Sequence, residues 1–124
     1  MSKTHKHILI VEDDQPLAHV LSLKIEAAGL IPLICEDGGE VIGFLEKYPI
    51  GLVVLDIILP TKNGFEVLEE LRNRSKVPPI VVWSNLEQEE DRDRARKLGI
   101  KDYFYKTKVS LTELLDYIVG HVSK

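Results

Sequence analysis

Short apolar runs alternate along the chain with segments whose apolar residues recur at the three- and four-residue spacing of an α-helix. The apolar runs predict five β-strands, at residues 8–11, 30–35, 52–55, 80–83 and 103–105. The third run, Leu-Val-Val-Leu, is the most apolar, so we expect it at the centre of a sheet with both faces covered. Pro32 has no backbone N–H to donate, which favours an edge position for the second strand.

Five helices are predicted between and after these strands. They are expected at residues 16–28, from residues 37–40 to Lys47, around Phe65, Leu68 and Leu71, at residues 86–98, and from residues 110–113 onward. The last of these begins with Ser-Leu-Thr-Glu, which is the pattern of a capping box. The fourth is nearly all charged, but its acids precede its bases, which suits the helix dipole.

This alternation of strands and helices predicts an α/β fold. Right-handed crossovers between parallel strands place helices on both faces of the sheet. We therefore expect a doubly wound (βα)5 fold and a single domain over residues 1–124. Among the orders known for such folds we choose the flavodoxin-like one, 2-1-3-4-5. In such folds ligands bind beyond the carboxyl ends of the strands, at the switch point between the first and third.

The composition narrows the classes of function. A chain of 124 residues can bury a core without a structural metal, and the single Cys35 excludes a disulfide framework. A net charge of −4 argues against sequence-independent nucleic-acid binding. No apolar run approaches the roughly 20 residues that span a bilayer, so we expect a cytoplasmic protein without membrane contact.

Polar residues follow four of the predicted strands, where the carboxyl ends of a parallel sheet meet. They are Glu12, Asp13 and Asp14 after the first strand, Asp56 after the third, Ser84 after the fourth and Lys106 after the fifth. Carboxylates from two neighbouring strands repel one another unless a cation neutralises them. Oxygen ligands with room left for water favour Mg²⁺.

This combination has the parts that phosphoryl transfer needs. Asp56 is a candidate nucleophile, and it needs no separate base because a carboxylate is already ionised at pH 7. Mg²⁺, the ammonium of Lys106 and the hydroxyl of Ser84 would stabilise the charge on the phosphoryl oxygens.

Over residues 7–122 the chain resembles the receiver domain of a two-component response regulator. The matching residues are Glu12-Asp13 after the first strand, Asp56-Ile57-Ile58-Leu59-Pro60 with Gly64, Ser84, and Tyr103-Phe104-Tyr105-Lys106. Each motif is weak alone, but together and in order they form a strong signal.

The resemblance implies a role for each matched residue. Asp56 would be phosphorylated, and Asp13, Asp56 and the backbone carbonyl of Ile58 would bind Mg²⁺, with Glu12 acting through water. Lys106 would pair with Asp56 and then with the phosphoryl group, Ser84 would move to bond that group, and Tyr103 would swing inward. Tyr103 is equally explained as a half-buried strand aromatic. Asp14 falls past the acidic pair and is expected to cap the first helix.

Four positions depart from the family pattern. Thr107 replaces the proline that usually follows the lysine, often after a cis bond, so the Lys106–Thr107 bond could be cis or trans. Asn85 replaces a smaller residue after the hydroxyl. Ile58 and Leu86 occupy the positions that help to place the hydrolytic water, and neither side chain can hydrogen-bond to it. We therefore predict slow self-dephosphorylation.

The resemblance implies a regulator rather than an enzyme. Its phosphodonor would be a sensor histidine kinase or a histidine phosphotransfer protein, and phosphorylation would shift a conformational population. The readout is expected on the fourth helix, fifth strand and fifth helix, through a downstream protein or a phosphorylation-dependent homodimer. Because the chain ends at Lys124, soon after the last helix, we expect no direct contact with DNA. The chain would be a single-domain regulator that acts through a partner, or a receiver cut from a longer protein.

Three alternatives remain open at this point. A Mg²⁺-dependent phosphohydrolase would use Asp56 as nucleophile, but it usually has an acid where this chain has Ile58, and a cap domain. A flavodoxin-like cofactor binder needs a phosphate loop after the first strand, where the three acids would repel a phosphate. A pseudo-receiver that binds partners without phosphorylation is suggested by Thr107 and Asn85 alone.

Overall fold

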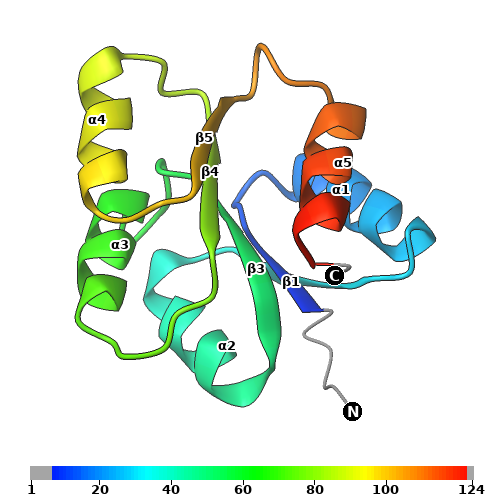
Figure 1. Cartoon of the computed structure of the whole chain (residues 1–124), viewed down its shortest axis with the longest axis horizontal. Coiled ribbons are helices and arrows are strands. Elements are labelled where there is room, and N and C mark those ends of the chain that lie inside the picture. Colours follow the sequence, from blue (N-terminus) through cyan, green and yellow to red (C-terminus); the bar gives the residue numbers. More distant parts are fainter. Residues whose placement is uncertain (1–6, 123–124) are drawn as a thin grey trace.

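A computed structural model describes residues 7–122, which form a parallel sheet between two layers of helices (Figure 1). The strands are β1 (His7–Val11), β2 (Ile31–Cys35), β3 (Ile50–Leu55), β4 (Ile80–Ser84) and β5 (Asp102–Tyr105). Their order is β2-β1-β3-β4-β5, and every neighbouring pair is parallel. The predicted fold class and strand order are therefore confirmed, with β2 at an edge.

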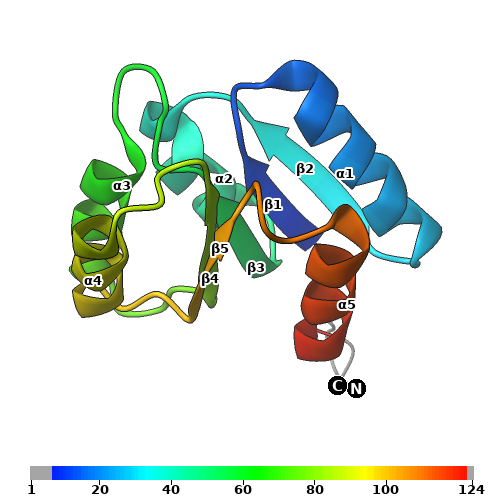
Figure 2. The same ribbon diagram turned by 90° about the horizontal axis from the view of Figure 1, so that it is seen from above.

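The helices are α1 (Gln15–Ala27), α2 (Val41–Lys47), α3 (Gly64–Arg72), α4 (Glu89–Lys97) and α5 (Leu111–Val122), and a short 3-10 helix, η1 (Gly38–Glu40), precedes α2. Helices α1 and α5 cover one face of the sheet, and α2, α3 and α4 cover the other (Figures 1 and 2). None of the helices within residues 7–122 combines the length and the apolarity that crossing a membrane requires.

Strand β1 shows why the apolar runs are unbroken. Leu9 and Val11 pack in the cluster under α2, α3 and α4, whereas Ile8 and Ile10 pack under α1 and α5. All four are fully buried. Because successive side chains of a strand point to opposite faces, a strand covered on both sides needs an apolar residue at every position.

Side-chain caps mark the starts of α1 and α5. Asp14 accepts a hydrogen bond from the Leu17 N–H at 3.2 Å, so the predicted cap of α1 is confirmed. Ser110 and Glu113 form the reciprocal bonds of the predicted capping box, at 2.8 and 3.0 Å.

Two helices begin later than predicted. Asp37 accepts a hydrogen bond from the Gly39 N–H at 2.8 Å, but it caps η1, and α2 starts only at Val41. Helix α4 starts at Glu89 rather than near residue 86, because the Leu86 N–H bonds to the hydroxyl of nearby Ser84 and the Leu86 carbonyl accepts from the distant Tyr103. Both shifts arise where backbone groups find partners outside the helix.

Candidate functional site

The ends of β1 and β3 bring three carboxylates together. Val11 pairs with Leu55, and the Asp56 N–H donates to the Val11 carbonyl at 3.0 Å, so the residues after both strands emerge side by side. One carboxylate oxygen from each of Glu12, Asp13 and Asp56 lies within 4.8 Å of the others. Glu12 and Asp56 are 1% and 5% exposed, whereas Asp13 is exposed to solvent. The predicted convergence of acids from two strands is confirmed.

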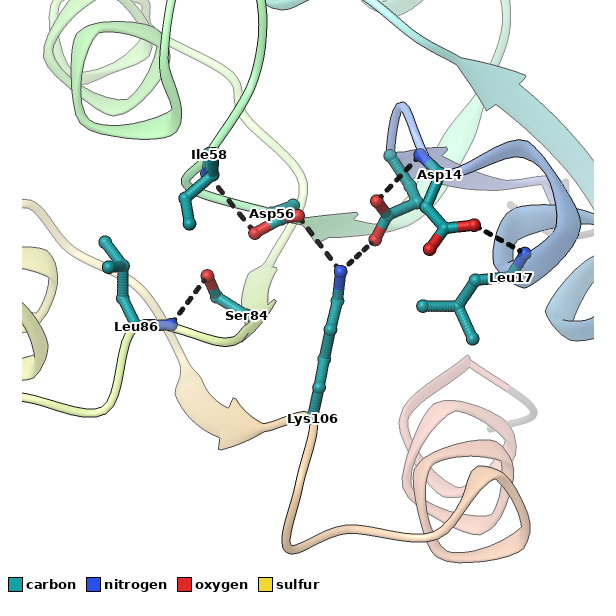
Figure 3. A network of polar contacts seen from close by, with 8 residues as sticks. Asp14, Leu17, Asp56, Ile58, Ser84, Leu86 and Lys106 are labelled. Carbon is teal, nitrogen blue, oxygen red and sulfur yellow. Dashed lines mark hydrogen bonds and ion pairs between the residues drawn. The ribbon is translucent and has the colours of Figure 1, made fainter.

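Lys106 reaches this cluster from the end of β5 (Figure 3). Its Nζ lies 3.0 Å from Asp56 Oδ2 and 2.5 Å from Glu12 Oε1. The bond between Lys106 and Thr107 is trans, which answers the question that the missing proline left open. A threonine after the lysine is therefore compatible with an ion pair between Lys106 and Asp56.

Burial and neighbouring charges shift the pKa values of both Glu12 and Lys106. Burial raises the pKa of Glu12, although its hydrogen bond with Lys106 acts in the opposite direction. Burial lowers the pKa of Lys106, but the hydrogen bond with Glu12 and the charge of Asp56 outweigh it, so the pKa of Lys106 rises overall. Lys106 is therefore a firmly protonated cation in a partly dehydrated cluster.

The donor set fits a divalent metal ion. Three carboxylates face the single ammonium of Lys106, so negative charge remains unneutralised when all of them are ionised. The ligand atoms are hard oxygens, which magnesium and calcium prefer, and the exposed carboxylate of Asp13 leaves one side open to water. Within residues 7–122 this is the one group of acids and histidines close enough to hold such an ion.

Residues 56–63 form the loop that joins β3 to α3. Asp56 Oδ1 accepts a hydrogen bond from the Ile58 N–H at 3.3 Å, and the side chain of Ile58 is exposed. The Gly64 N–H closes the loop by donating to the Ile57 carbonyl at 2.7 Å. A Cβ at Gly64 would lie 2.6 Å from the Asp56 carbonyl oxygen, so only glycine fits there.

Ser84 ends β4 and is fully buried. Its hydroxyl points toward Asp56 (Figure 3) and accepts a hydrogen bond from the Leu86 N–H at 3.3 Å. The Ser84 carbonyl accepts from the Lys106 N–H at 2.9 Å, so the ends of β4 and β5 are tied together. Trp83 packs on the opposite face under α1 and α5, as the alternation of strand side chains predicts.

Tyr103 lies inward. It is 8% exposed, and its hydroxyl donates to the Leu86 carbonyl at 2.8 Å. Burial raises the pKa of Tyr103 to about 12, so the hydroxyl stays protonated and able to donate. The proposed inward swing of this ring stays a prediction, since the structure contains one position of it.

Sequence reasoning missed two contacts around the site. One is the direct ion pair between Glu12 and Lys106, since the resemblance placed Glu12 on the metal through water. The other is a hydrogen bond from the Thr107 hydroxyl to the Glu87 carboxylate, which joins the loops after β5 and β4. The sequence contained a signal for this second contact, because Glu87 and Thr107 follow the ends of two strands that are neighbours in the predicted order.

Comparisons with known proteins agree with this geometry. The family described as response regulator receiver domain matches residues 8–119. The chain is 32% identical over 113 residues to the Regulator of RpoS of Escherichia coli, covering 91% of this chain and 34% of that protein. It is 36% identical over 100 residues to the Aerobic respiration control protein ArcA of Escherichia coli, covering 81% of this chain and 42% of ArcA. The chain thus spans less than half the length of these relatives.

Solved receiver domains share the fold. The Francisella response regulator 1452 receiver domain superposes with a TM-score of 0.87 at 24% identity, covering 95% of this chain and 97% of that one. A CheY-like response regulator receiver domain protein of Methanospirillum hungatei gives 0.86 at 25% identity, covering 95% and 94% of the two chains. The family matches residues 8–119, the folds agree, and an acidic cluster lies beside a lysine. The chain therefore belongs to the response regulator receiver domain family of two-component signalling.

Proposed function

We propose that this chain is a phosphoacceptor switch in which Asp56 receives a phosphoryl group from a histidine kinase or a histidine phosphotransfer protein. The observation that carries the proposal is the placement of Asp56, which is buried, 3.0 Å from Lys106 Nζ, and within 4.8 Å of Glu12 and Asp13. Such a carboxylate is flanked by a fixed cation and lies close to the solvent-exposed carboxylate of Asp13.

Asp13, Asp56 and the Ile58 carbonyl would hold Mg²⁺, with Glu12 contributing through water. The bound ion would neutralise charge on the transferring group. An oxygen of Asp56 forms the new bond to phosphorus while the bond to the histidine nitrogen breaks, and the imidazole keeps that electron pair. Lys106, whose Nζ lies 3.0 Å from Asp56 Oδ2, would stabilise the charge on the phosphoryl oxygens, and the Ser84 hydroxyl points toward Asp56 from the end of β4 (Figure 3).

Phosphorylation would be read on the surface formed by α4, β5 and α5. Ser84 and Tyr103 both bond to the backbone of Leu86, three residues before α4 begins. A new bond from Ser84 to the phosphoryl group would compete with the one from Leu86 and shift the population of α4 positions. The surface includes a hollow lined by Arg92, Tyr105, Lys108 and Tyr117, which suits a protein partner or a second copy of the chain.

A mass measurement tests the proposal. Incubation with acetyl phosphate and Mg²⁺ should add the mass of one phosphoryl group to the intact protein, and omission of the metal should greatly reduce the amount. Asp56→Asn is the matched control and should remain unmodified. No added mass in the unaltered protein would support a pseudo-receiver, and continued turnover of phosphate esters would support a phosphohydrolase.

The phosphoryl group on Asp56 should be long-lived. Ile58 is exposed beside Asp56, and Leu86 meets the site through its backbone, so neither side chain can orient an attacking water. Ile58→Asn and Leu86→Glu supply a polar group that can orient water and should each accelerate decay, and a group that acted as a full general base would do so by about 100-fold or more. The loss of radiolabel over time measures this, and unchanged decay in both variants would contradict it.

We further propose that residues 1–124 act as one receiver module in the cytoplasm and deliver their signal through a separate effector. Net charge of −4 makes direct nucleic-acid binding by this module unfavourable. Size-exclusion chromatography with and without phosphorylation would distinguish an effector that binds the monomer from a phosphorylation-dependent homodimer.

A further inference from the structure

A glycine in the turn before α2 touches the backbone of residues 56–63, the loop between β3 and α3, which we call the phosphoacceptor loop after the role proposed for Asp56. A Cβ added at Gly38 would lie 1.9 Å from the carbonyl oxygen of Lys62 and 2.9 Å from its carbonyl carbon. Gly38 does not have a positive φ, so its backbone conformation is open to other residues and only the space is lacking. Figure 2 shows the cyan segment that leads into α2 beside the green loop that leads into α3.

The phosphoacceptor loop has little freedom to move away from Gly38. Thr61 has a φ of 66°, and the Lys62 N–H donates to the Pro60 carbonyl at 2.6 Å. The side chain of Lys62 is paired with Glu70 of α3 at 2.6 Å. At its far end the loop is closed by the bond from Gly64 to Ile57. A displacement at Lys62 therefore passes back along the loop toward Ile58 and Asp56.

We propose that Gly38 is a positioning residue for the metal site, a role that rests on the function proposed above. The close approach of Gly38 to Lys62 holds the phosphoacceptor loop, and with it the Ile58 carbonyl, at the depth that the carboxylates of Asp13 and Asp56 require. Mg²⁺ demands near-ideal octahedral geometry, whereas Ca²⁺ tolerates irregular coordination at longer distances. A side chain at position 38 should consequently weaken the binding of Mg²⁺ more than that of Ca²⁺.

The neighbouring glycine provides a matched control. A Cβ at Gly39 would meet its nearest neighbour, Asp37 Oδ1, at 3.4 Å and Thr61 Cγ2 at 3.8 Å, which are ordinary contacts. Gly38→Ala and Gly39→Ala add the same methyl group to adjacent positions of η1. They differ in whether the phosphoacceptor loop must shift, and to a smaller extent in the crowding of the Val67 side chain, which a Cβ at Gly38 would approach to 3.1 Å.

Calorimetric titration with Mg²⁺ and with Ca²⁺, on the full chain without a phosphodonor, tests the role. Gly38→Ala should raise the dissociation constant for Mg²⁺ by about 10-fold or more, as loss of a supporting contact at a metal site does, and that for Ca²⁺ by clearly less. Gly39→Ala should change both by less than about twofold. An unchanged Mg²⁺ affinity in Gly38→Ala, or an equal loss for both cations, would overturn the proposal.

A second pair of variants separates positioning from folding. Thr61→Gly lets the backbone at this position adopt φ values of either sign, so the loop can relocate without unfolding the protein. Gly38→Ala combined with Thr61→Gly should regain the thermal stability of Thr61→Gly while keeping the weakened Mg²⁺ binding. Recovery of both the thermal stability and the Mg²⁺ affinity would show that the methyl group harmed only stability, and it would overturn the positioning role of Gly38.

The same titrations separate this inference from the proposed function. The inference alone would be overturned if the unaltered protein binds Mg²⁺ and is phosphorylated on Asp56, and the Gly38→Ala variant binds the ion equally well. An unaltered protein that binds neither cation would overturn the metal-dependent switch, and the role of Gly38 with it.

Discussion

Helices α1 and α4 both follow a strand that ends at the site, yet they are held in different ways. α1 starts directly after the acidic cluster and buries Ala18, Leu21 and Ile25 completely. In α4, which has nine residues, Ala95 is the buried one. Its other attachments are polar or cationic: Arg94 lies 4.1 Å from the centre of the Phe65 ring, and Arg92 donates to the Tyr105 hydroxyl at 3.4 Å.

We infer from this difference that the half of the site next to α1 is rigid and that the half next to α4 can move. Packed apolar surface can be displaced only by opening a cavity, whereas exposed ion pairs and cation–π contacts contribute little each and can reform in another position. The carboxylates therefore sit on the rigid side, and Ser84 and Tyr103 connect to the side that can shift. Such an arrangement would let the phosphorylation of Asp56 that we propose move α4 while the carboxylates keep their positions.

The largest effect is expected from truncating one side chain in each of the two helices. Leu21→Ala should lower the free energy of unfolding by about 2–5 kcal/mol, because it leaves a cavity under α1. Arg94→Ala should lower it by less than about 1 kcal/mol, because the Arg94 side chain is 55% exposed and its pair with Glu69 spans 3.4 Å. Urea unfolding followed by Trp83 emission measures both. Equal losses would remove the contrast.

Amide exchange measures the contrast without mutation. The backbone amides in the interior of α4 should exchange at least about 10-fold faster than those of α1, since few buried contacts oppose the local opening of α4. Hydrogen–deuterium exchange resolved by NMR gives both rates in one sample. Similar protection in the two helices would mean that α4 is held as firmly as α1.

Tyr103→Phe should loosen α4 alone. The substitution removes the hydrogen bond to the Leu86 carbonyl, which ties β5 to the segment before α4, and should cost about 1 kcal/mol of unfolding free energy. Exchange should rise in α4 and stay constant in α1, which serves as the internal control. A uniform rise across both helices would instead indicate general destabilisation.

The smallest effect is expected at the position where the family usually has proline. Thr107→Val removes the hydroxyl that donates to Glu87 while keeping the shape of the side chain. A double-mutant cycle with Glu87→Ala should give a coupling energy below about 1 kcal/mol, because both side chains are exposed. A larger value would mean that this contact, rather than Tyr103, is the main attachment of the loop.

Most of the site could be placed before the structure was known, because its residues follow strand ends. Once the order 2-1-3-4-5 is assigned, Asp13, Asp56 and Lys106 must emerge at one edge of the sheet. The start of α4 was harder to place, because local pattern favours a helix from residue 86. Hydrogen bonds from Leu86 to Ser84 and from Tyr103 to Leu86 override that pattern.

The amino-acid sequence by itself determined the succession of strands and helices, the two helix layers and the polar residues at the strand ends. The succession follows from apolar periodicity and the two layers from the chirality of crossovers, which act locally or apply to every chain, whereas the sheet order was chosen among the known doubly wound orders. Only the tertiary structure decided that Lys106 contacts Glu12, that the bond to Thr107 is trans, and that Gly38 lies against Lys62. Such contacts join loops distant in sequence, and their distances depend on the exact path of the backbone, which no residue pattern encodes.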